Sequence, residues 1–173
     1  MKNNIILVTG GARSGKSSFA ENLIGSDCQN KTYIATCPAF DEEMRQRIKI
    51  HREQRRNNGW VTIEEQYDLV RALADASGNV LIDCLTLWIN NLLYQNKDFN
   101  EAMMVERTKN LLVALKKYPG QVVLVINEVG LGLVPENSLG RLFRDCSGRC
   151  GQMIAHESDE VYWMVCGLSQ RLK

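Results

Sequence analysis

The sequence predicts a single α/β domain, residues 1–173, in which a mainly parallel sheet is flanked by helices. Three observations support this prediction. Short apolar runs alternate with helical segments, which is typical of parallel strands joined by right-handed crossovers. A glycine-rich segment joins the first apolar run to the first helical segment, as in nucleotide-binding α/β proteins. The 173 residues contain no internal repeat, low-complexity tract or linker that would divide them.

Five apolar runs have the composition of strands that are covered on both faces. The third run contains a carboxylate, Asp83, near its end, and the fourth, with the sequence QVVLVIN, is the most hydrophobic. The fifth run is expected to be the last strand of the sheet. In chain order, the predicted strands are residues 4–9, 31–36, 79–84, 121–127 and 160–166.

Four segments have the pattern of helices. The second is strongly basic, with Asp41 as its expected cap and the residues Asn57-Asn58-Gly59 as its end. The third and fourth have an apolar stripe on one side. The predicted helices are residues 17–24, 41–56, 100–117 and 138–154, with stripes of Met104, Thr108, Leu111, Leu112 and Leu115 in the third and of Leu139, Leu142, Phe143 and Cys146 in the fourth.

The composition is ordinary for a globular protein, with 45% hydrophobic and 24% charged residues. A net charge of +1 gives no overall field that would attract nucleic acid, and no apolar run is long enough to span a membrane. The N-terminus does not have the pattern of a signal peptide, so a cytoplasmic protein is expected. The six cysteines are therefore predicted to be free structural thiols, since a zinc site at Cys146 and Cys150 would need two further ligands.

The glycine-rich segment matches the phosphate-binding pattern G-x-x-x-x-G-K-[ST]. Glycines let the backbone approach phosphate closely, and successive N–H groups together with the positive end of the following helix attract the anion. Lys16 is expected to reach the β- and γ-phosphates, and Ser17 to supply a hydroxyl to Mg²⁺. The alternative is a glycine turn with an exposed lysine. The predicted phosphate site consists of Gly10, Gly11, Ala12, Arg13, Ser14, Gly15, Lys16 and Ser17.

Asp83 is the predicted second ligand of the metal, because an acid at the end of a buried strand holds Mg²⁺ in proteins with this loop. Two alternatives stay open. Asp83 could instead cap a helix that begins at Leu85, since aspartate is favoured at such caps. Glu128 follows the next apolar strand and could take the metal in place of Asp83.

Residues 45–56 contain six basic residues and one acidic residue. Within them Arg47, His51 and Arg55 are spaced four apart, so they lie on one face of a helix. Guanidinium groups disfavour protonation of an imidazole and could hold a triphosphate against it, which would permit attack on the α-phosphate. A solvent-facing basic helix with an incidental histidine is the interpretation that these residues alone favour. RNA binding is a minor alternative, because no aromatic residue precedes Trp60 in the segment.

Together these segments resemble the bifunctional adenosylcobinamide kinase/adenosylcobinamide-phosphate guanylyltransferase family of cobalamin biosynthesis. The resemblance extends over nearly the whole chain. Residues 127–137 (NEVGLGLVPEN) are its most distinctive part, whereas many NTPases share the glycine loop. The other segments that carry it are residues 7–17, 33–36, 41–44, 47–51 and 143–149.

The resemblance implies a RecA-like P-loop fold and two successive reactions. A nucleoside triphosphate, ATP or GTP, first phosphorylates the aminopropanol hydroxyl of adenosylcobinamide. GTP then guanylylates a histidine with loss of pyrophosphate, and adenosylcobinamide phosphate takes the GMP to give adenosylcobinamide-GDP. That histidine corresponds to His51, which follows Ile50 where some relatives have a second histidine. Some members of the family are homotrimers, so a homo-oligomer is expected.

The resemblance also implies a set of contacts to the guanine nucleotide and Mg²⁺. Relatives often have glutamate at the position of Asp83, so the carboxylate here reaches one methylene less far. Lys16 and His51 are the implied catalytic residues, and Ser17 and Asp83 the implied metal ligands. Beyond the phosphate loop, the implied nucleotide contacts are Thr36, Cys37, Pro38, Arg52, Glu53, Gln54, Arg55, Glu64 and Asp83.

Two other functions are weighed against this one. The chain could be a P-loop kinase of another small molecule, in which His51 is incidental. It could also be a non-catalytic regulator that binds GTP. The regulator is disfavoured, because Lys16, Ser17, Asp83 and His51 together make a full set for chemistry.

Overall fold

The computed structural model describes residues 4–25, 28–38, 42, 46, 49, 52–53, 55 and 57–173. Its strands are β1 (Asn4–Gly10), β2 (Lys31–Ala35), β3 (Trp60–Glu64), β4 (Asn79–Asp83), β5 (Gln121–Asn127), β6 (Glu160–Val165) and β7 (Leu168–Arg171). Its helices include α1 (Lys16–Ile24), α3 (Leu69–Asp75), α4 (Leu85–Gln95), α5 (Glu101–Lys117) and α6 (Ser138–Glu157).

The seven strands form one sheet in the order β3-β2-β4-β5-β1-β6-β7. Every neighbouring pair is parallel except β6 and β7, which confirms the predicted α/β fold with a mainly parallel sheet. Carboxyl ends of parallel strands lie at the same edge of a sheet. The ends of β1, β5 and β4, with Gly10, Asn127 and Asp83, therefore meet at one edge, where ligands of open α/β sheets bind.

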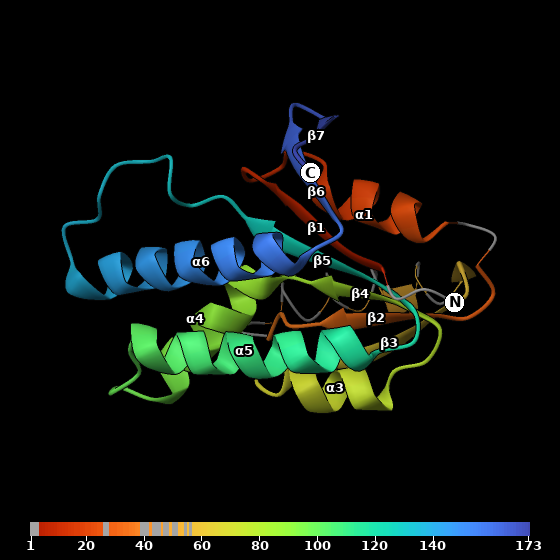
Figure 1. Cartoon of the computed structure of the whole chain (residues 1–173), viewed down its shortest axis with the longest axis horizontal. Helices are drawn as coiled ribbons and strands as arrows, with labels where there is room; N and C mark the ends of the chain where they lie inside the picture. Colours follow the sequence, from red (N-terminus) through yellow and green to blue (C-terminus); the bar gives the residue numbers. More distant parts are fainter. Residues whose placement is uncertain are drawn as a thin grey trace.

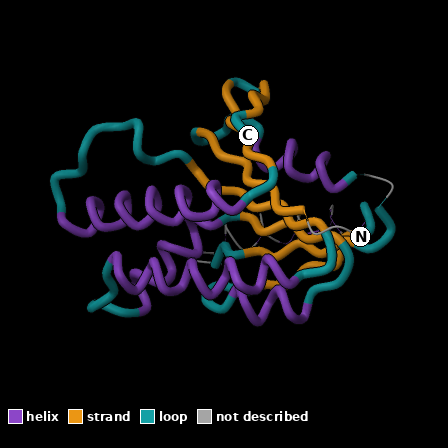
Figure 2. The backbone as a smooth tube through the Cα atoms, viewed as in Figure 1, coloured by secondary structure: helices purple, strands orange, loops and turns teal. Residues whose placement is uncertain are grey.

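Helices cover both faces of the sheet (Figures 1 and 2). Ile6 and Val8 of β1 belong to the apolar cluster on the side of α1. Ile5 and Leu7 belong to the larger cluster, which contains residues of α3, α4, α5 and α6. Because alternate side chains of β1 are buried on opposite faces, the strand is a continuous apolar run rather than an alternating one.

The predicted helices 17–24, 100–117 and 138–154 are present as α1, α5 and α6. All five residues of the stripe predicted for α5 are buried. The stripe of α6 is wrong at its start, since Leu139 is 45% exposed. Leu142 and Phe143 are half-buried against the core, and full burial begins at Cys146, because the first turns of α6 extend beyond the sheet (Figure 1). Among the described residues, no helix is long and apolar enough to cross a membrane.

Three elements do not appear in the prediction: β3, α3 and β7. Helix α4 begins at Leu85, where one alternative for Asp83 placed a helix. The expectation that residues 160–166 form the last strand is wrong. After β6 the chain turns at Cys166 and Gly167, which both have a positive φ, and returns as β7. All residues of β7 are exposed, so no apolar pattern marks this strand in the sequence.

The basic segment is helical at the residues that the structure describes. Its last helical residue is Asn57, and a turn follows at Asn58 and Gly59. This agrees with the predicted helix and its predicted end. Arg47 and His51 lie outside the described residues.

Three cysteines, Cys84, Cys146 and Cys150, are buried in the core, with 7%, 0% and 0% of their surface exposed. Burial raises the pKa of Cys84 and Cys146 to about 11 and that of Cys150 to about 12. These thiols therefore stay protonated near neutral pH, as expected for structural cysteines.

We expect iodoacetamide to alkylate the exposed Cys166 rapidly near neutral pH and to leave Cys84, Cys146 and Cys150 unmodified in the native protein. The reacting species is the thiolate, and burial together with a raised pKa suppresses it at the three core cysteines. Mass spectrometry of peptides after timed alkylation measures each rate. In denaturant the buried thiols should react as fast as Cys166, and fast native labelling of Cys150 would contradict its burial.

Candidate functional site

The phosphate loop connects β1 to α1 at the carboxyl edge of the sheet. A Cβ at Gly10 would lie 2.4 Å from the carbonyl oxygen of Met164, so only glycine lets β1 enter the loop beside β6. Arg13 and Gly15 have φ values of 55° and 93°. Left-handed residues within a turn direct successive N–H groups to one side, where they form a concavity for an anion.

The loop is held mainly through its carbonyl groups. The Gly10 oxygen accepts from the N–H of Glu128 at 2.9 Å, and the Ser14 oxygen accepts from the N–H of Gly167 at 3.0 Å. No described side chain caps the N-terminus of α1. The first N–H groups of a helix have no intrahelical acceptor, so those of α1 are available to a phosphate.

Lys16 is folded into this loop and is only 7% exposed. Its ammonium donates to the Gly11 oxygen at 2.5 Å and to Ser14 Oγ at 3.5 Å. Burial lowers the pKa of Lys16, against the opposing influence of Cys84 and Asp83. A phosphate placed in the loop would favour the charged ammonium again, so the buried lysine is suited to bind an anion.

Ser17 and Asp83 come together from α1 and β4. Ser17 Oγ donates to Asp83 Oδ2 at 2.9 Å, and the hydroxyl of Tyr33 donates to the same oxygen at 2.7 Å. Burial and the neighbouring Asp83 carboxylate raise the pKa of Tyr33, so this hydroxyl remains a donor. A carboxylate and a hydroxyl in contact beside the phosphate loop are the two protein oxygens that the metal prediction requires.

The two alternatives for Asp83 can be compared with this geometry. The residue at the N-cap of α4 is Cys84, and its side chain makes no capping bond. The carboxylate of Glu128 accepts from the N–H groups of Gly130 and Leu131 within its own loop. Asp83 is therefore the acid that contacts Ser17.

The described part of the basic helix lies against the ends of β2 and β3. The guanidinium of Arg55 stacks on the ring of Tyr33, with 3.9 Å between its central carbon and the ring centre. Arg52 forms an ion pair of 3.3 Å with Glu64. Contacts thus run from Arg55 through Tyr33 and Asp83 to Ser17, and they connect the basic helix to the phosphate loop.

The other predicted nucleotide contacts have different surroundings. Thr36 is fully buried, and its hydroxyl donates to the Cys84 oxygen and accepts from the Cys84 N–H, both at 2.8 Å. This pair of bonds fixes the ends of β2 and β4 to one another. Cys37 and Pro38 follow at the same edge and are half-buried, whereas Glu53 is exposed. His51 and Gln54 lie outside the described residues.

The pocket over the phosphate loop has a volume of about 490 Å³. Besides loop residues and Asp83, it is lined by Ser18, Cys84, Val125 and Asn127. Asn127 and Tyr33 are not among the site residues predicted from the sequence. The signal for Asn127 is its position, because it ends the strand that pairs with β1 and so reaches the same edge.

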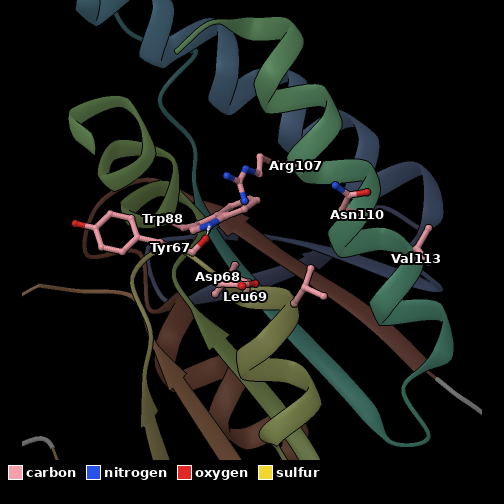
Figure 3. A pocket seen from close by; sticks show the side chains of 8 residues that line it. Tyr67, Asp68, Leu69, Trp88, Arg107, Asn110 and Val113 are labelled. Atoms are coloured by element: carbon pink, nitrogen blue, oxygen red, sulfur yellow. Dashed lines mark hydrogen bonds between the residues drawn. The ribbon is translucent and has the colours of Figure 1, made fainter. Parts of the chain in front are cut away.

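A separate hollow of about 390 Å³ lies between α3, α4 and α5 (Figure 3). The N–H of the Trp88 indole donates to the Tyr67 oxygen at 2.9 Å, and Arg107 and Asn110 of α5 line the hollow. It shares no lining residue with the phosphate pocket and contains none of the predicted site residues. The candidate functional site is therefore the phosphate pocket with the adjoining basic helix.

Comparisons with known proteins find relatives that match nearly the whole chain. The bifunctional adenosylcobalamin biosynthesis protein CobU of Escherichia coli K12 is 43% identical over 98% of this chain and 99% of its own. The corresponding protein CobP of Pseudomonas aeruginosa PAO1 is 44% identical over 96% of each chain. A KaiC-like protein of Pyrococcus horikoshii OT3 has a TM-score of 0.55 at 16% identity, over 94% of this chain and 71% of its own, which shows the fold alone.

The family model described as cobinamide kinase / cobinamide phosphate guanyltransferase matches residues 6–172. This match covers the phosphate loop, the basic helix and residues 127–137, which are among the segments on which the resemblance rests. The chain therefore belongs to the cobinamide kinase / cobinamide phosphate guanyltransferase family.

Proposed function

We propose that the chain phosphorylates adenosylcobinamide and then transfers GMP from GTP to the product, with one phosphate loop holding the triphosphate for both reactions. The observation that supports this proposal best is the contact of Ser17 with Asp83 beside the buried Lys16. An ammonium, a hydroxyl and a carboxylate at a helix N-terminus are the groups that phosphoryl transfer requires.

In the kinase reaction, the acceptor oxygen attacks the γ-phosphorus and the nucleoside diphosphate leaves. The N–H groups at the start of α1 hold the phosphates in place, and Lys16 neutralises the charge that builds on the oxygens around the reacting phosphorus. Burial of Lys16 strengthens this interaction, because little water competes for its ammonium.

The residues at this site fit a magnesium ion. Mg²⁺ prefers oxygen ligands and is commonly held by one or two protein oxygens together with phosphates and water. Ser17 Oγ and Asp83 Oδ2, which lie 2.9 Å apart, are oxygens of this kind. Bound there, the ion would neutralise charge on the phosphate oxygens.

In the second reaction, an imidazole nitrogen of His51 attacks the α-phosphorus of GTP and pyrophosphate leaves. A phosphate oxygen of the acceptor then attacks the guanylyl phosphorus, and the bond to the histidine nitrogen breaks. Support comes from the described neighbours of His51 in the same segment. Arg55 packs on Tyr33, whose hydroxyl binds Asp83, so this part of the basic helix is anchored next to the phosphate pocket.

The histidine proposal is tested with GTP labelled at the α-phosphate. We expect the wild-type protein to become labelled without any acceptor, through a bond that is labile in acid and stable in base, as phosphoramidates are. The variant His51→Ala should lose the label and keep its kinase activity, and GTP labelled at the γ-phosphate should leave no label on the protein. Absence of α-label on the wild type would contradict the proposal.

Substitution Lys16→Ala should lower kcat of the kinase reaction by at least about 100-fold, because it removes a preorganised positive charge from the transferred phosphate. Initial rates of adenosylcobinamide phosphorylation measure this loss. Lys109→Ala, on the exposed side of α5, is the matched control and should keep the wild-type rate. Equal rates in the two variants would remove Lys16 from the mechanism.

Substitution Asp83→Asn should raise the Mg²⁺ concentration needed for half-maximal activity by at least about tenfold, because a neutral amide is a weaker ligand than a carboxylate. Titration of activity with MgCl₂ measures the shift. The control Asp75→Asn breaks only an exposed ion pair with Arg71 and should leave the titration unchanged. An Asp83→Asn curve that overlies the wild type would show that this carboxylate holds no metal.

A further inference from the structure

A second cavity, which is not the hollow beside Trp88, adjoins the phosphate pocket. It has a volume of about 250 Å³ and lies between α6 and the sheet, against Leu7 of β1, Ile126 of β5 and Val161 of β6. Asn127 lines both this cavity and the phosphate pocket. Its carboxamide makes no hydrogen bond within the described part of the chain. A group bound in the cavity can therefore reach the phosphate pocket past Asn127.

The α6 wall of the cavity consists of Gln152 and four small residues, Ser147, Gly148, Gly151 and Ala155. Ser147 is 3% exposed, and its Oγ has no hydrogen-bond partner among the described residues. Two other buried hydroxyls on helices of this chain, those of Thr108 and Ser158, donate to the carbonyl four residues earlier, at 2.8 Å. A buried hydroxyl without a partner is unfavourable, so Ser147 indicates a polar ligand at this cavity.

We propose that the cavity binds the amide-linked aminopropanol arm of the corrinoid acceptor and directs its hydroxyl past Asn127 to the phosphate pocket, an inference that rests on the proposed function. The arm combines a methyl group, an amide and a hydroxyl. Leu7, Ile126 and Val161 match the methyl group and the methylenes, and Ser147 Oγ can bond to the amide.

The size of the cavity favours the arm over the whole acceptor. Pockets that take drug-sized ligands have volumes of about 300–1,000 Å³. At about 250 Å³, this cavity is below that range and too small for a corrin ring. The ring would remain outside, where the loop that follows β5 carries Leu131 and Leu133, which are 79% and 96% exposed.

Two arginines of α6 hold that loop by hydrogen bonds to its carbonyl oxygens. Arg144 of α6 donates to the Gly132 oxygen at 3.1 Å and to the Gly130 oxygen at 2.5 Å. Arg141 donates to the oxygens of Pro135 and Glu136. The loop extends away from the sheet along α6 (Figure 2). Its exposed leucines therefore form a fixed apolar surface beside the cavity, suited to the methyl-rich edge of the ring.

Gly148 allows a direct test. It lines the cavity, and a Cβ added there would meet nothing within 4 Å. Leucine and alanine both favour helix more than glycine, so Gly148→Leu and Gly148→Ala should fold. Gly148 is exposed at the rim of the cavity, and only leucine is large enough to obstruct its mouth. We expect Gly148→Leu to raise KM for adenosylcobinamide about tenfold or more, Gly148→Ala to leave it near the wild-type value, and Ser147→Ala to raise it roughly 2- to 10-fold.

Labelling of the protein by GTP alone separates this inference from the proposed function, because it needs no acceptor. All three variants should label at the wild-type rate. A folded Gly148→Leu with a wild-type KM for adenosylcobinamide would overturn the inference, and so would an increase in the KM for GTP instead. Equilibrium dialysis of adenosylcobinamide tests binding without turnover. Binding that is lost in Gly148→Leu and kept in Gly148→Ala supports the cavity even if the wild type proves inactive.

Discussion

The rest of the structure depends on one constraint at the phosphate loop: its N–H groups have to stay free for an anion while its backbone is held still. The chain meets this constraint by bonding the loop through its carbonyls. Glu128, just after β5, binds the Gly10 oxygen, and Gly167, between β6 and β7, binds the Ser14 oxygen. Both neighbours of β1 therefore have to be parallel strands that end at the same edge, which fixes β1 as a central strand.

A second set of contacts connects the phosphate loop, proposed for the kinase reaction, to the basic segment, proposed for guanylyl transfer. The Asp83 carboxylate accepts from the hydroxyls of Ser17 and Tyr33, and the ring of Tyr33 carries the guanidinium of Arg55. These three contacts join α1 to β4, β4 to β2, and β2 to the basic segment. Displacement of the basic helix would therefore remove a cation from Tyr33 and alter the surroundings of the carboxylate proposed to hold the metal.

The sequence predicts the parts of this arrangement that are local in the chain. The glycine loop is a contiguous motif, and Asp83 ends an apolar run, so both can be found without tertiary information. Tyr33 cannot, because its role comes from the pairing of β2 with β4, which brings its hydroxyl to Asp83. Strand β7 has no buried side chain, and the cavity at Ser147 exists only because α6 packs over β1 and β5. The periodicity of apolar residues indicates which side of a helix or strand is buried. It does not indicate which helices and strands pack against one another.

The two faces of the sheet suggest how one triphosphate can react at two phosphorus atoms. Tyr33, on which Arg55 stacks, belongs to the apolar cluster on the side of α1, so Arg55 lies at that face. Leu7 and Ile126, which line the second cavity, belong to the opposite cluster. In the proposed enzyme the acceptor therefore reaches the nucleotide from the face opposite to Arg55, which leaves the side of that arginine free for the second nucleophile. Separate approaches let a single loop hold the triphosphate for attack at the α- or the γ-phosphorus.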